Sequence, residues 1–79
     1  MKLVGIGFGN MVNAERIIAV VSPESNPVKR LIATGKENGM LIDATQGRKT
    51  KSVILMDSDH IVLSYLNVER IDAKLEGEQ

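Results

Sequence analysis

Three of the ten basic side chains of this sequence lie close together in the glycine-led segment Gly47–Lys51, which we call the basic turn. Arg48, Lys49 and Lys51 could release condensed counterions on meeting nucleic-acid phosphates, so such a segment can act as an electrostatic anchor. Thr50 could add a hydrogen bond to a phosphate or a base edge. The same residue types are also typical of a solvated loop, and their spacing alone leaves both interpretations open.

A second segment, Gly5–Gly9, resembles the start of a dinucleotide-binding loop because its glycines follow a predicted strand. That motif needs a third glycine at a fixed spacing and a helix that begins there to receive the pyrophosphate. Asn10 occupies the third glycine position, and the residues that follow are strand-like. We therefore expect a tight connection in which glycine supplies backbone freedom.

The segment Asp57–His60 contains two carboxylates and the only histidine of the chain. A calcium loop needs more oxygen ligands over a longer stretch, and a catalytic histidine needs a nucleophile beside it. The segment is better interpreted as a hairpin turn with a solvated histidine. We accordingly predict no catalytic residue, metal or cofactor, and the chain is not expected to be an enzyme.

The composition limits the class of protein. With 79 residues and no cysteine, the chain is expected to be one domain that lacks disulfides and gains stability from self-association. The sequence shows neither a signal peptide nor an apolar run of the ~20 residues that a membrane helix needs, and we expect a cytoplasmic protein without a membrane partner. Phe8 and Tyr65 are the only aromatic residues, which disfavours recognition by stacking of many bases.

The formal net charge of zero conceals an asymmetry along the chain. Residues 1–56 carry eight basic and four acidic side chains, a net of +4, whereas residues 57–79 carry two basic and six acidic ones, a net of −4. This segregation is consistent with one basic and one acidic face, although a short chain can also segregate charge by chance.

Apolar runs separated by turn residues predict an α+β fold in the order ββα followed by βββα. The strands are expected at Lys2–Ile6, Arg16–Val21, Met40–Ala44, Ser52–Met56 and His60–Tyr65. Arg16, which opens an apolar strand, could lie along the sheet edge or meet a ligand or a neighbouring subunit.

Cap residues predict two helices. The first is expected from Pro27 to Asn38, with Ser25 or Asn26 as its cap, and the second follows Asn67. The prediction is therefore a small, largely antiparallel β-sheet with two helices. Residues 1–75 would form a single domain for DNA binding and oligomerisation, and residues 76–79 a frayed tail.

Four motifs follow one another from about Lys2 to Leu75. They are Gly7-Phe8-Gly9-Asn10-Met11-Val12; Val21-Ser22-Pro23 with Pro27 and Lys29-Arg30; Asp43-Ala44-Thr45-x-Gly47-Arg48-x-Thr50; and Asp57-Ser58-Asp59-His60. Their order and spacing resemble the RemA family of bacterial extracellular matrix regulatory proteins.

The resemblance implies a DNA-binding transcriptional regulator that activates genes for biofilm matrix production and osmoprotection. It also implies a ring-shaped homo-oligomer, whose subunits resemble the LytTR type of DNA-binding domain and which binds repeated promoter sites on double-stranded DNA. The DNA-contacting positions of the family fall on Arg16, Arg48 and Lys49, and Pro27 matches a position associated with assembly geometry. At position 49 the family usually has arginine; lysine keeps the charge but loses the bidentate fork.

Taken together, these observations predict DNA contacts at Arg16, Arg48, Lys49 and Lys51. One subunit offers few cations, but a ring repeats the contact and raises the effective concentration of each later binding event. Two alternatives remain open. One is an RNA-binding regulator built on the same ring, and the other is an adaptor that binds a protein through the sheet edge or the acidic C-terminal helix.

Overall fold

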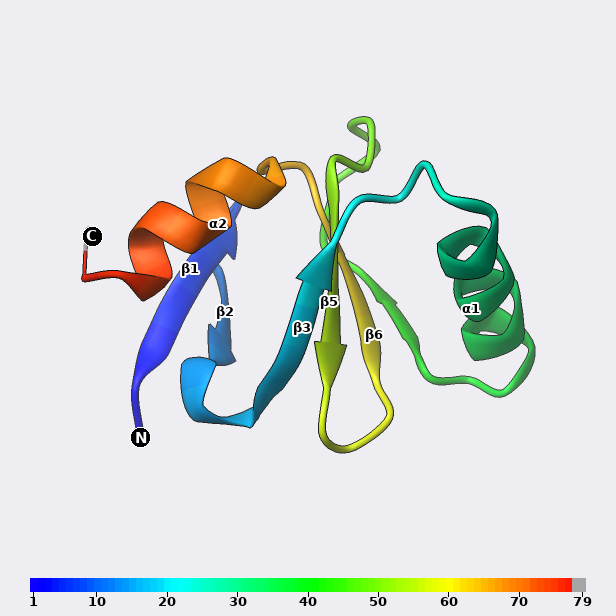
Figure 1. Cartoon of the computed structure of the whole chain (residues 1–79), viewed down its shortest axis with the longest axis horizontal. Helices are drawn as coiled ribbons and strands as arrows, with labels where there is room; N and C mark the ends of the chain where they lie inside the picture. Colours follow the sequence, from blue (N-terminus) through cyan, green and yellow to red (C-terminus); the bar gives the residue numbers. More distant parts are fainter. Residues whose placement is uncertain (78–79) are drawn as a thin grey trace.

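A four-stranded sheet of order β3-β5-β6-β4 forms the centre of the computed structural model, which describes residues 1–77 (Figure 1). Its strands are β3 (Ile17–Val21), β4 (Leu41–Asp43), β5 (Ser52–Met56) and β6 (Ile61–Ser64). β5 pairs antiparallel with both β3 and β6, whereas β4 runs parallel to β6. The antiparallel pairing of β5 with β6 confirms the hairpin predicted for Ser52–Met56 and His60–Tyr65.

The two faces of the sheet are covered by different elements because side chains alternate along β5 and β6. Val53, Ile61 and Leu63 pack against Val28 and Ile32 of α1 (Asn26–Glu37). On the other face, Ile54 packs with Ile6 of β1 (Leu3–Gly7) and Ile71 of α2 (Val68–Leu75). β1 pairs with β2 (Asn10–Asn13) in a separate two-stranded sheet. The result is a three-layer arrangement with apolar contacts on both sides of the central strands.

Capping residues determine where both helices begin. The Ser25 hydroxyl accepts a hydrogen bond from the Val28 backbone N–H at 3.3 Å, so Ser25 caps α1 and Pro27 lies in its first turn. The Asn67 side chain accepts from the Arg70 N–H at 2.8 Å and caps α2, as the sequence predicts. Glu76 and Gly77 donate backbone hydrogen bonds to Asp72 and Lys74; the remainder of the expected tail, residues 78 and 79, lies outside the described residues. Within residues 1–77, neither helix has the length and apolar character needed to cross a membrane.

Two expectations about the strands are corrected. β2 was not predicted, because its sequence Asn-Met-Val-Asn lacks an apolar run and its strand conformation depends on pairing with β1. Arg16 ends a short 3₁₀ helix, η1 (Ala14–Arg16), instead of opening β3, because the Asn13 side chain accepts from the Glu15 N–H and starts a helical turn. The prediction of a largely antiparallel sheet is confirmed: within residues 1–77 three of the four strand pairings are antiparallel, and β4 joins β6 in parallel.

Ser64 joins the two sheets. Its buried hydroxyl donates to the Ile6 carbonyl of β1 at 2.8 Å and accepts from the Leu66 N–H at 3.1 Å. Ser52, directly opposite on β5, is equally buried, yet its hydroxyl has no hydrogen-bond partner within the described chain. Two serines in paired positions therefore differ in their hydrogen bonds and not in their burial.

This difference predicts opposite effects of one substitution at the two serines. Ser64→Ala leaves the Ile6 carbonyl and the Leu66 N–H without their partner and is expected to lower the free energy of unfolding by about 1–3 kcal/mol. Ser52→Ala, the matched control, removes a hydroxyl that is buried without a partner and should be neutral or stabilising. Urea unfolding at one protein concentration compares the variants, and equal losses at both positions would contradict the assignment.

Candidate nucleic-acid interface

The basic turn lies in the loop between β4 and β5, at the end of the sheet where β5 begins (Figure 1). The Arg48 backbone N–H donates to the Thr45 carbonyl at 2.9 Å and closes a tight turn. The two central residues, Gln46 and Gly47, have φ angles of 54° and 80°. Positive φ at both central positions is typical of a type I′ turn, which explains why the segment contains a glycine.

Hydrogen bonds hold this loop at both ends. On the β4 side, Asp43 Oδ1 accepts from the Thr45 hydroxyl at 2.6 Å and from the Thr45 backbone N–H at 2.9 Å. On the β5 side, the Lys51 N–H donates to the Ser64 carbonyl at 2.9 Å. The Thr45 hydroxyl, and to a smaller extent its backbone N–H, hold the pKa of Asp43 below its ordinary value. The cations are therefore presented by a loop with a defined conformation.

The three cations of the basic turn are exposed and available. Arg48, Lys49 and Lys51 all lie on the surface. No carboxylate in residues 1–77 lies within ion-pairing distance of any of them. A phosphate could thus bind without first displacing an internal carboxylate from that part of the chain.

Arg16 lies at the opposite end of the sheet. Ile17 pairs with Met56 at the far end of β5, and the Asp57 N–H donates to the Arg16 carbonyl at 2.9 Å. The guanidinium Nη1 also forms an ion pair with Asp57 Oδ2 at 3.2 Å. Within one subunit the structure does not bring Arg16 to the basic turn. An exposed ion pair of this kind contributes only about 0–1 kcal/mol, so Arg16 can exchange its partner readily.

The segment Asp57–His60 forms the turn between β5 and β6, as expected. Asp57 is engaged by Arg16, and the Ser58 hydroxyl lies 2.7 Å from His60 Nδ1. Asp59 adopts a φ angle of 71°, a left-handed conformation that aspartate tolerates in turns. Asp57 is therefore accounted for by its ion pair with Arg16, and Asp59 by its place in the turn.

Pro27 is exposed on the first turn of α1, on the face of the sheet opposite α2. Its missing N–H is no cost at this position, where a helix has no internal acceptor for it. Pro27 lies on a different element from the basic turn. Its predicted role in assembly stays a prediction.

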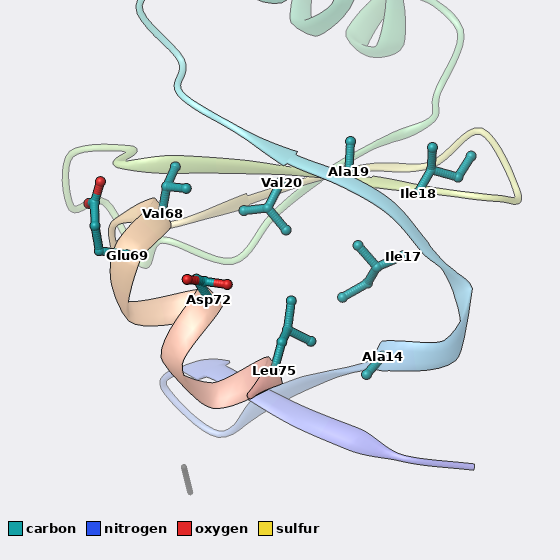
Figure 2. Close-up of a pocket in the computed structure, with 9 residues that line it drawn as sticks. All are labelled: Ala14, Ile17, Ile18, Ala19, Val20, Val68, Glu69, Asp72 and Leu75. Atoms are coloured by element: carbon teal, nitrogen blue, oxygen red, sulfur yellow. The ribbon is translucent and has the colours of Figure 1, made fainter. Parts of the chain in front are cut away.

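A hollow of about 460 Å³ lies between β3 and α2 (Figure 2). Ile17, Val20 and Leu75 point into it, and the carboxylate of Asp72 faces the same space. β3 is an edge strand that pairs only with β5 among the described strands, so its outer backbone edge borders this hollow. The site has an apolar floor and an acidic rim, which suits a protein surface better than a phosphate.

A second hollow, of about 640 Å³, lies beside the basic turn and contains residues that the sequence did not single out. It is lined by Lys51, Tyr65, Leu66, Asn67, Glu69, Arg70 and Ala73. Arg70 is near Lys51 only because the chain after β6 turns back into α2. In the sequence, Arg70 is a single arginine in the first turn of a predicted helix. Its position there does not indicate which residues lie beside it in the fold.

Replacement of Thr45 tests how the basic turn is held. In Thr45→Val the hydroxyl is lost, and the pKa of Asp43 should rise toward its ordinary value, as measured by NMR titration of the carboxyl carbon. Because the folded-state pKa lies below the unfolded one, the stabilisation is present above the unfolded pKa and is lost as pH falls through the folded pKa. The variant should therefore be less stable than the parent at neutral pH, and the difference should shrink in acid. Thr50→Val, in the same loop, is the control and should leave the titration of Asp43 unchanged.

Comparison with known proteins identifies the family. The family model described as RemA-like, extracellular matrix regulatory protein A-like, matches residues 3–75. A protein of Natranaerobius thermophilus is 55% identical over 75 residues, which cover 95% of this chain and 84% of the relative. One of Halothermothrix orenii is 55% identical over 78 residues, 99% of this chain and 93% of the relative. Both are named "Putative regulatory protein". The chain therefore belongs to the RemA-like family of extracellular matrix regulatory proteins.

Proposed function

We propose that this protein is a DNA-binding transcriptional regulator that acts in the cytoplasm as a homo-oligomeric ring. Its targets would be genes for biofilm matrix production and osmoprotection, which it activates by binding repeated sites in promoter DNA. Membership of a family of matrix regulators supports the regulatory part of the proposal. The subunit would correspond to the LytTR type, and no catalytic step is involved.

One observation carries the DNA-binding part. Arg48, Lys49 and Lys51 are exposed on a loop that hydrogen bonds hold at both ends, and no carboxylate of residues 1–77 pairs with them. A rigid loop loses little conformational entropy when its side chains meet a phosphate backbone. Lysine at position 49 favours contact with phosphates over bidentate base recognition. The loop would therefore anchor the DNA backbone.

Arg48→Ala combined with Lys49→Ala tests this role. Loss of a charge-assisted contact to a phosphate is expected to cost about 1.5–3 kcal/mol, which is roughly ten- to 150-fold in Kd. The slope of log K against log salt should also fall by about one for each phosphate contact removed. Mobility shift on promoter DNA at several salt concentrations measures both quantities, with native mass as a check on assembly. Unchanged DNA binding by an intact oligomer would rule out the proposed contact.

One comparison distinguishes an RNA-binding regulator from a DNA-binding one, and another distinguishes two roles of Arg16. Stronger binding of RNA than of duplex DNA under the same salt conditions would favour a post-transcriptional regulator. Arg16→Ala separates the roles of that residue: weaker DNA binding by an intact oligomer marks a DNA contact, whereas dissociation to monomers marks a contact between subunits. The second outcome is consistent with the position of Arg16 beside the edge strand β3.

Two features of the β3 region support self-association. The outer edge of β3 has no partner strand among residues 1–77, and open edges pair readily with another chain. Ile18, the second residue of β3, is 67% exposed and borders the hollow between β3 and α2. A second copy that covers this edge would bury an apolar side chain and supply backbone hydrogen bonds.

Ile18→Lys tests this surface. A lysine on an open edge disfavours strand pairing, and the variant is expected to shift toward the 8.6 kDa monomer in native mass spectrometry at micromolar concentration. Ile18→Val, which keeps the edge apolar, should retain the parent mass. If Ile18→Lys keeps the mass of the parent, the subunits associate through another surface.

A further inference from the structure

The hollow beside the basic turn combines two cations from different parts of the chain. Lys51 precedes β5 and Arg70 lies in the first turn of α2, yet both line the same space. The Lys51 N–H donates to the Ser64 carbonyl, and Tyr65 follows Ser64 directly. This hydrogen bond therefore holds Lys51 close to Tyr65, which lines the same hollow. Figure 1 shows α2 beginning at the end of the molecule that also carries the loop 44–51.

We propose that Arg70 is a further DNA-contacting residue, and that the hollow between Lys51 and α2 receives a phosphodiester of the DNA backbone next to the one held by the basic turn. This inference rests on the proposed DNA binding and adds to it a residue and a path. A strand laid across this end of the subunit would meet Arg48, Lys49, Lys51 and Arg70. Arg16, at the other end of the sheet, would lie off that path.

Among residues 1–77, four of the five polar side chains that line the hollow can donate a hydrogen bond: Lys51, Tyr65, Asn67 and Arg70. Arg70 is exposed and has no carboxylate within ion-pairing distance in residues 1–77. The Asn67 side-chain oxygen is occupied by the Arg70 backbone N–H, which leaves its amide N–H groups as the polar atoms on offer. Tyr65 also lines the hollow, and its hydroxyl can donate a hydrogen bond. A phosphate, which only accepts hydrogen bonds, fits such a lining.

The Tyr65 ring is held from behind by the β1–β2 turn. Gly7 lies so close to the ring that a Cβ at this position would overlap Tyr65 Cε1. The Phe8 ring packs against Tyr65 in a tilted arrangement, with ring centroids 4.7 Å apart and an interplanar angle of 37°. Phe8 reaches this position with a φ angle of 56°, in the left-handed region that favours glycine. The hairpin therefore fixes one wall of the hollow before any ligand arrives.

Among residues 1–77, Glu69 is the one carboxylate that lines the hollow, and it opposes an anionic ligand. With Lys51 and Arg70 the lining still carries a net positive charge. This arrangement makes two neighbouring residues of α2 act in opposite directions on the same ligand. Removal of the Arg70 charge should weaken DNA binding, whereas removal of the Glu69 charge should strengthen it.

The experiment compares three substitutions that each remove one charge without adding another. Arg70→Gln is expected to weaken binding of duplex promoter DNA by roughly three- to tenfold and to lower the salt slope by about one contact per subunit that touches DNA. Glu69→Gln should strengthen binding by a smaller factor. Lys36→Gln, in the last turn of α1 and outside the hollow, is the control and should bind as the parent does.

Native mass and urea unfolding verify that each variant is folded and assembled, and Arg70→Lys should restore part of the affinity because it returns the charge. If Arg70→Gln binds like Lys36→Gln while Arg48→Ala with Lys49→Ala loses binding, the DNA-binding proposal stands and the role of Arg70 is wrong. If the parent protein does not bind duplex DNA at all, the proposed function fails and this inference fails with it.

Discussion

The structure depends on the hydrogen bonds of one residue, Ser64, at the end of β6. Its hydroxyl joins the β1–β2 hairpin to the central sheet through the Ile6 carbonyl and accepts from Leu66 on the way to α2. Its carbonyl accepts from Lys51, the last residue of the basic turn. The hairpin, the basic turn and the start of α2 are therefore positioned relative to one another through a single residue. Because a buried polar group must keep its partners, these elements cannot shift independently.

The separation of charges between the two ends of the sheet explains how a chain without net charge can present a basic surface. The positive charges of the basic turn lie at one end of the sheet, whereas Asp57 and Asp59 lie in the β5–β6 turn at the other end, where Arg16 is paired. Electrostatic attraction to a polyanion depends on the local arrangement of charges and not on their sum. Because Glu69 lines the hollow beside the basic turn, the proposed affinity for DNA would depend on repetition of the site in the proposed oligomer.

The sequence predicted most elements because their causes are local. Ser25 and Asn67 are recognisable caps, Pro27 suits a first helical turn, and apolar residues that are buried on both faces make up most of β5 and β6. It failed to predict β2, whose four residues become a strand through pairing with β1, and the parallel pairing of β4 with β6. Both failures concern contacts between segments, which local propensity does not encode.

The residue types of the candidate interface, the glycine that its turn requires and membership of the family were all determined by the sequence alone, since they are properties of short segments and their order. Only the tertiary structure decided which cations lie side by side. It separates Arg16 from Arg48, although both were predicted as contacts, and it brings Arg70 to the side of Lys51 through the turn after β6. The physical reason is that side chains meet where strands pair and helices fold back. Strand register and helix packing, and not distance along the chain, therefore select the members of a site.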